Sequence, residues 1–107
     1  MTKFKFNKKT TELFEAILSL GTVKEAEAFF RDLCTAEEIR DMADRWRIAR
    51  MIDEGRSYRK IAQDLGTSTT TVARVASWLN NGQGGYRLVL GRQASHHHNS
   101  SPTGKGM

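Results

Sequence analysis

The sequence predicts an all-α protein, and two observations lead to this class. Apolar side chains recur at intervals of three and four residues, the spacing of one face of an α-helix, and the first half of the chain lacks the alternation typical of strands. Polar and glycine-containing segments separate the periodic stretches. The 107 residues provide for one domain. Because a small body buries a small share of its surface, a second copy of the chain is a natural source of further core.

The N-terminal residues 1–9 are expected to form a loose basic arm, because lysine and phenylalanine alternate there without a helix signal. A first helix is predicted to begin at Thr10 or Thr11 and to end at Gly21. Four apolar side chains fall on one stripe of this helix: Leu13, Phe14, Ile17 and Leu18.

Two capping boxes predict the starts of the next two helices. Thr22 is followed by Glu25, and Thr35 is followed by Glu38, so in each case a hydroxyl and a carboxylate can bind free backbone N–H groups at a helix start. The second box opens the longest periodic stretch of the chain, for which we expect a helix over about residues 35–54.

Residues 57–80 have the pattern of a helix-turn-helix. Ser57 is a suitable N-cap for a short first helix, and Gly66 permits the left-handed backbone of a tight turn after it. The small Ala62 lets the second helix cross the first one closely. The inward face of the first helix is formed by Ile61, Ala62 and Leu65. The alternative interpretation of residues 57–80 is an unrelated helical hairpin in which the Ala-x-x-x-Gly pattern occurs by chance.

The second helix of this motif has a short, polar outward face. The run from Ser68 to Thr71 has poor helix propensity, so its place at a helix start indicates capping and hydrogen bonding to phosphates or base edges. Small side chains also let a helix settle into a major groove about 12 Å wide. Arg74 offers the strong directional contact, toward guanine.

Positive charge is concentrated around the motif, because residues 57–92 contain five basic and one acidic side chain. Free N–H groups and the helix dipole at the start of the first helix favour a phosphate, and a solvated basic face without a partner is the alternative. The residues expected to contact DNA are Tyr58, Arg59, Lys60, Ser68, Thr69, Thr70, Thr71, Arg74 and Ser77.

The C-terminal part of the chain is harder to predict. Residues 82–92 could form a short docking helix or an extended strap, and we favour the helix, which gives a domain over residues 10–92. Residues 93–107 are small and polar and contain the only proline, so we expect a disordered tail. The histidines at positions 96–98 are expected to be solvated, with no metal site.

The remaining sequence features exclude several classes of protein. The single cysteine, Cys34, excludes an internal disulfide and fits a reducing compartment. Neither a membrane span nor a secretory leader is visible, so we expect a cytoplasmic, nucleoid-associated protein. The chain has no glycine-rich phosphate loop, paired Cys/His ligands or nucleophile elbow, so we expect neither an enzyme nor a cofactor.

From about Leu33 to Leu90 the sequence resembles the Trp-repressor superfamily, and most closely its small YerC/YecD-type branch of bacterial proteins. The residues that carry the resemblance are Leu33, Thr35, Glu38, Arg45, Arg47, Ile48, Leu65, Gly66, Thr71, Val72 and Arg74. The resemblance implies a Trp-repressor-like domain that forms an intertwined homodimer, whose two recognition helices enter successive major grooves of double-stranded DNA.

The founding member of that superfamily uses tryptophan as a corepressor. The resemblance places Arg45, Arg74 and Thr35 at positions of its tryptophan pocket, and a role of Arg74 in that pocket is the alternative to its contact with guanine. The glycine and the serine that leave room for the indole there are replaced by Val75 and Trp78 in this chain. Because both replacements add bulk, we expect them to fill the cavity, so that no small-molecule corepressor binds.

Together these features predict a sequence-specific transcriptional regulator, expected to repress by occupying a palindromic DNA site as a homodimer. The alternative is a protein-interaction module, in which the helix-turn-helix serves as a scaffold that docks onto the transcription machinery. That alternative predicts weak, sequence-indifferent affinity for DNA.

Overall fold

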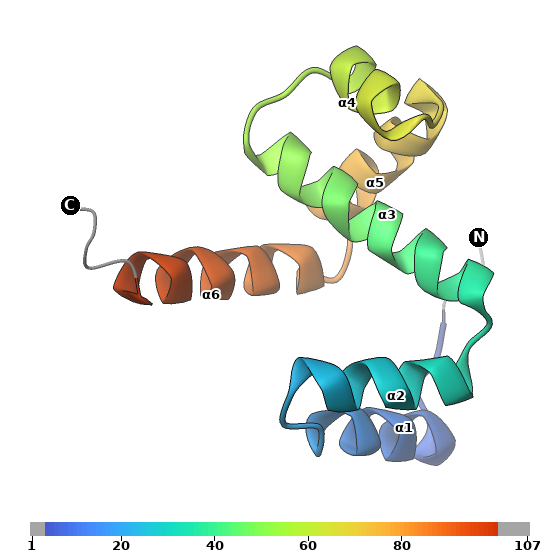
Figure 1. The fold of residues 1–107 in the computed structure, drawn as a ribbon. Coiled ribbons are helices and arrows are strands. Elements are labelled where there is room, and N and C mark those ends of the chain that lie inside the picture. Colours follow the sequence, from blue (N-terminus) through green and yellow to red (C-terminus); the bar gives the residue numbers. More distant parts are fainter. Residues whose placement is uncertain (1–3, 101–107) are drawn as a thin grey trace. The chain divides into compact units, whose positions relative to one another are not determined.

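The computed structural model describes residues 4–100, and the side chains of residues 4–95. Within this range the chain contains six helices and no strand (Figure 1), so the predicted all-α class is confirmed. The helices are α1 (Lys8–Leu18), α2 (Val23–Leu33), α3 (Ala36–Asp53), α4 (Tyr58–Leu65), α5 (Thr69–Asn81) and α6 (Gly85–Ser100). The chain divides into two compact units, an N-terminal unit up to Arg40 and a C-terminal unit from Asp41, and α3 contributes residues to both.

In the N-terminal unit, side-chain caps determine where the helices begin. The Asn7 side chain accepts the Thr10 N–H at 3.0 Å, and the Thr10 hydroxyl accepts the Asn7 N–H at 2.8 Å. This reciprocal cap starts α1 at Lys8, earlier than the predicted start, and shortens the loose arm. The predicted box of Thr35 and Glu38 forms with bonds of 2.8 and 3.0 Å at the start of α3.

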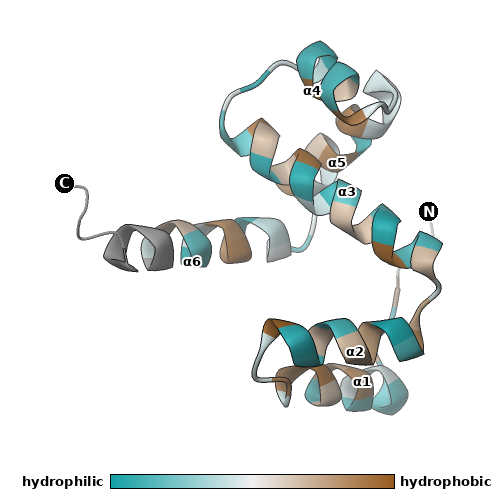
Figure 2. Ribbon diagram, in the orientation of Figure 1, coloured by the Kyte–Doolittle hydropathy of each residue, from teal (hydrophilic) through white to brown (hydrophobic). Residues whose placement is uncertain are grey.

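The helices of the N-terminal unit have apolar stripes but no buried side chain. Figure 2 shows apolar segments along α1 and α2, yet neither helix contains a buried residue. Leu18 is 83% exposed and Val23 75% exposed. Phe6 packs beside Phe14 with ring centroids 6.0 Å apart, although both rings remain exposed. These stripes therefore remain available for further packing.

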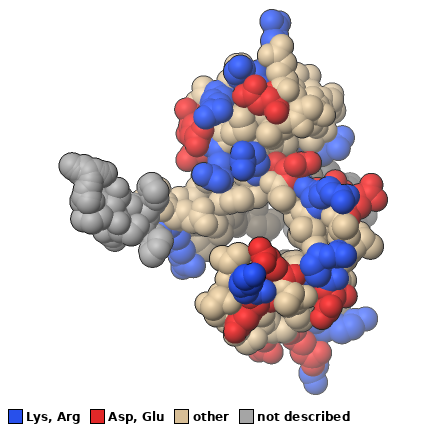
Figure 3. Space-filling view, in the orientation of Figure 1, with Lys and Arg blue, Asp and Glu red and all other residues tan. Residues whose placement is uncertain are grey.

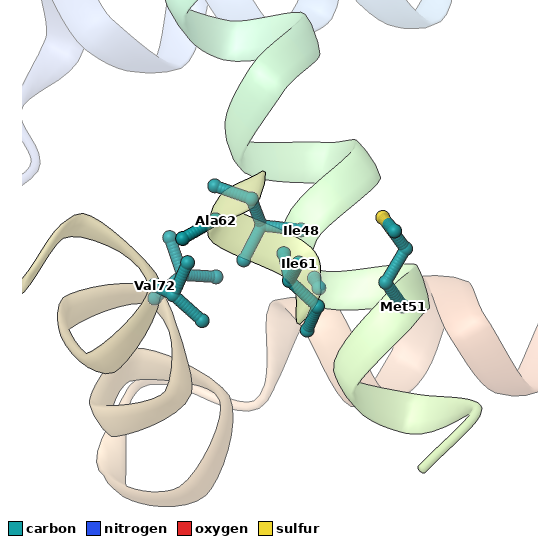
Figure 4. Packing of buried hydrophobic residues seen from close by; sticks show 7 residues of the cluster. Ile48, Met51, Ile61, Ala62 and Val72 are labelled. Carbon is teal, nitrogen blue, oxygen red and sulfur yellow. The ribbon is translucent and has the colours of Figure 1, made fainter. Parts of the chain in front are cut away.

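The core of the C-terminal unit joins α3, α4 and α5. Side chains from the three helices converge in Figure 4, and Ile48, Ile61 and Val72 are completely buried. The full cluster consists of Ile48, Ala49, Met51, Ile61, Ala62, Val72 and Val75. The apolar spacing of the sequence predicted the inward face of α4, of which Ile61 and Ala62 are buried and Leu65 packs against the cluster. This core holds α4 and α5 against α3.

The C-terminal segment forms a longer helix than the sequence predicted. A Cβ atom at Gly82 would lie 2.4 Å from the Trp78 carbonyl oxygen, so the end of α5 requires a glycine there. Helix α6 then runs from Gly85 to Ser100, past the domain boundary expected at residue 92. No proline interrupts the sequence before Pro102, so the helix can continue past residue 92. The expected disorder of residues 101–107 and the histidine side chains lie outside the described residues.

The described helices also bear on membrane association. Within residues 4–100, no helix combines the length and the apolar character that crossing a membrane requires.

Candidate nucleic-acid interface

The turn between α4 and α5 has the geometry that the sequence predicted. Gly66 adopts the left-handed conformation, with φ 67° and ψ 34°. The Thr67 N–H donates to the Ala62 carbonyl at 3.0 Å, which closes the end of α4. A Cβ atom on Gly66 would meet nothing within 4 Å, so the backbone conformation, and not a lack of space, requires the glycine. Ala62 is buried where α4 and α5 pack together.

The hydroxyl run at the start of α5 divides into two pairs. The Ser68 hydroxyl accepts the Thr71 N–H at 3.1 Å and lies 3.1 Å from the Thr71 hydroxyl, so these two residues cap the helix. Thr69 and Thr70 are exposed, and neither makes a side-chain hydrogen bond within the described residues. Of the four predicted contact residues in this run, Thr69 and Thr70 therefore have hydroxyls that are free for an external partner.

The exposed side chains at the start of α4 differ in their surroundings. Tyr58, Arg59 and Lys60 are all exposed, and the Ser57 hydroxyl accepts the Lys60 N–H at 3.2 Å as the predicted N-cap. The Lys60 ammonium lies 3.4 Å from a carboxylate oxygen of Asp64, whereas Arg59 makes no ion pair within the described residues. Figure 3 shows this end of the molecule, where basic side chains lie beside acidic ones.

A polar hollow of about 310 Å³ lies between α3 and α5. Its walls include Asp41, Asp44, Arg45, Arg74, Val75 and Trp78. Val75 is 1% exposed, whereas Trp78 is 46% exposed. The hollow therefore lies beside both bulky residues, with Val75 in the core and Trp78 at its edge. Thr35 belongs to the N-terminal unit and is exposed.

Comparison with known proteins identifies the family. The family model described as Trp repressor protein matches residues 8–94. The chain belongs to the Trp repressor family. A relative of this family member is the protein YerC of Bacillus subtilis (strain 168), 45% identical over 85 residues, which are 79% of this chain and 82% of YerC.

Two solved structures resemble this Trp repressor family member. A TrpR-like protein from Eubacterium eligens has a TM-score of 0.79 and 42% identity, and the match covers 82% of this chain and 91% of that chain. A candidate Trp repressor from Staphylococcus aureus has a TM-score of 0.79 and 39% identity, with 83% of this chain and 89% of that chain covered. The fold and the family inferred from the sequence are therefore confirmed.

An apolar groove lies beside the end of α5 in this Trp repressor family member, and the sequence analysis missed it. Its volume is about 700 Å³, and Trp46, Trp78, Tyr86 and Val89 line it. The Trp46 and Tyr86 rings stack with centroids 6.2 Å apart and an interplanar angle of 10°. Tyr86 and Val89 belong to the segment for which the sequence favoured a docking helix. The groove itself depends on how α3, α5 and α6 pack, which the spacing of residues does not give.

The contacts of Arg87 on α6 were not predicted from the sequence. Its guanidinium donates to the Asn80 side-chain oxygen at 2.9 Å and lies 3.5 Å from a carboxylate oxygen of Asp53. One side chain thus connects α6 to the ends of α5 and α3. These polar contacts help to orient α6 in the C-terminal unit.

The division of the hydroxyl run predicts different effects of two similar substitutions. Ser68→Ala removes the N-cap of α5 and is expected to lower the free energy of unfolding by about 0.5–2 kcal/mol. Thr70→Ala removes an exposed hydroxyl that caps nothing, so we expect a change below about 0.5 kcal/mol. Urea unfolding at one fixed protein concentration measures both values. Equal stability of the two variants would contradict the assignment of Ser68 as the cap.

Proposed function

We propose that the chain is a sequence-specific DNA-binding transcriptional regulator, most simply a repressor, that inserts α5 into the major groove. The single observation that carries this proposal is the tight α4–α5 crossing, which leaves the start of α5 exposed and polar. The family supports a DNA-binding regulator in general, because its model is that of a repressor protein. Insertion into the DNA major groove, binding to a specific target sequence and the roles of individual residues go beyond what the family implies, and we propose them here.

The exposed residues of the motif fit two kinds of DNA contact. Arg59 and Lys60 stand at the N-terminus of α4, where phosphate contacts are expected, and Tyr58 is exposed beside them. Thr69 and Thr70 have hydroxyls suited to base edges or thymine methyl groups. Arg74 and Ser77 follow on the exposed side of α5, whereas Ser68 and Thr71 contribute by fixing the start of the helix.

Two incomplete apolar surfaces support action as a homodimer. The N-terminal unit buries none of its apolar side chains in α1 or α2, and the C-terminal unit has an apolar groove of about 700 Å³. A second copy supplies both kinds of surface, so an intertwined dimer would bury what one chain leaves exposed. Two recognition helices related by a two-fold axis would contact half-sites about 34–36 Å apart on a palindromic duplex.

We further propose that the regulator does not respond to tryptophan. Arg45 and Arg74 face a common hollow, as a ligand with a carboxylate would require. However, the same hollow contains Trp78, whose ring is large, and the carboxylates of Asp41 and Asp44. These groups form walls of the free space of about 310 Å³, and the carboxylates of Asp41 and Asp44 would repel the carboxylate of a bound tryptophan.

Selection of bound duplexes from a random pool tests the proposed function. A sequence-specific dimeric regulator is expected to enrich an inverted repeat whose half-sites lie about one helical turn apart. A helix-turn-helix that serves only as a protein-docking scaffold would enrich no sequence. That second outcome would reject the proposal.

Substitution of Arg59 tests its assignment to a phosphate. Arg59→Ala is expected to weaken binding to every duplex and to reduce the slope of log affinity against log salt by about one unit for each bound subunit. The matched control is Arg40→Ala, because Arg40 is exposed on α3 outside the motif and makes no ion pair within the described residues. Gel-shift titrations over a range of salt measure both effects. An unchanged affinity and slope for Arg59→Ala would contradict the assignment.

Calorimetry with free tryptophan tests the absence of a response. The native protein is expected to show no saturable heat at micromolar protein and ligand. The variant Trp78→Ser enlarges the hollow without removing a buried side chain, since Trp78 is 46% exposed. Micromolar binding by the native protein would refute the proposal, and a gain of binding by the variant alone would identify the Trp78 ring as the cause of exclusion.

A further inference from the structure

Asp64 is the single acidic residue among residues 57–92, and it lies next to two basic side chains. One of its carboxylate oxygens is 3.4 Å from the Lys60 ammonium, one helical turn earlier on α4. The other is 4.0 Å from the guanidinium of Arg56, which precedes the helix and lies closer, at 3.2 Å, to a carboxylate oxygen of Glu54. The Asp64 side chain is 34% exposed, so solvent and any docked polyanion can reach this cluster.

Helix stability does not explain an aspartate at this position. Asp64 lies in the last turn of α4, where the negative end of the helix dipole disfavours a carboxylate. In its pair with Lys60 the lysine comes first in the sequence, which is the weaker order for an ion pair one turn apart. Exposed pairs of this kind contribute little to folding. The position of Asp64 therefore calls for another explanation.

The cluster occupies the end of the motif at which phosphates are expected to bind. Lys60 belongs to the first turn of α4, beside Arg59. A phosphate that approaches Lys60 must either displace the Asp64 carboxylate or bind close to it, and the two anions repel each other. Arg59 has no such competitor within the described residues, so its guanidinium is available at once.

We infer that Asp64 competes with DNA phosphates for Lys60 and thereby limits sequence-independent affinity. This inference rests on the proposed function, because it concerns the same interface. Nonspecific binding depends almost entirely on neutralised phosphates, whereas specific binding adds contacts from α5 to base edges. A carboxylate that weakens the attraction between basic side chains and DNA phosphates lowers nonspecific affinity more than specific affinity. It therefore increases the ratio of specific to nonspecific affinity.

The test compares Asp64→Asn, which keeps the shape and removes the charge, with the native full-length chain. The probe is a duplex of random sequence, titrated at several salt concentrations. We expect the variant to bind roughly three to ten times more tightly at low salt, with a steeper salt dependence. Asp64→Ala is expected to give the same direction of change, so the result does not depend on one replacement.

Two controls separate the effect from a simple change in net charge. Glu27→Gln changes the charge by the same amount on α2, outside the helix-turn-helix, and is expected to change the affinity less than about twofold. Lys60→Ala in the Asp64→Asn background is expected to abolish most of the gain. In the native background the same lysine substitution should have a smaller effect, because Asp64 already occupies that side chain.

The possible outcomes distinguish this inference from the proposed function. If the native protein binds DNA but Asp64→Asn binds no more tightly, or if Glu27→Gln gains as much, the inference is overturned and the proposed function stands. If neither the native protein nor any variant binds the duplex at low salt, both are overturned.

Discussion

The packing of α4 and α5 against each other on α3 is the constraint on which the candidate interface depends. Ile48, Ile61 and Val72 are completely buried where the three helices meet. The buried Ala62 and the left-handed Gly66 allow the close crossing and the sharp turn. Because the inward face of α5 is fixed by this core, its outward face is fixed as well. The exposure of Thr69, Thr70 and Arg74 is thus a consequence of apolar packing elsewhere on the same helix.

The candidate interface combines capping side chains and free side chains in neighbouring residues of similar chemistry. Ser68 and Thr71 use their hydroxyls to hold the start of α5, while Thr69 and Thr70 keep theirs free within the described residues. On α4, Arg59 is unpaired there, whereas Lys60 is paired with Asp64. Local hydrogen bonds and ion pairs therefore determine which side chains are available to an external partner. Two threonines, or two basic residues, need not contribute equally to binding such a partner.

Features set by local spacing could be predicted from the sequence, and features set by three-dimensional packing could not. The helix-turn-helix, its Ser57 cap and the box of Thr35 and Glu38 depend on residues a few positions apart. The Asn7 cap was equally local and was missed because it precedes the apolar stripe. The two hollows beside Trp78 arise where helices meet, so no spacing within one segment could reveal them.

Apolar side chains are buried unevenly in the two units of the chain. The buried core of the described chain lies in the C-terminal unit, while α1 and α2 bury nothing. If the second copy covers those helices, pairing supplies apolar burial that one chain lacks, and stability then depends on protein concentration. In the proposed dimer, pairing would also fix the distance between the two copies of α5. The same apolar contacts would therefore complete the fold and set the spacing of the half-sites, so loss of pairing would remove stability and sequence specificity together.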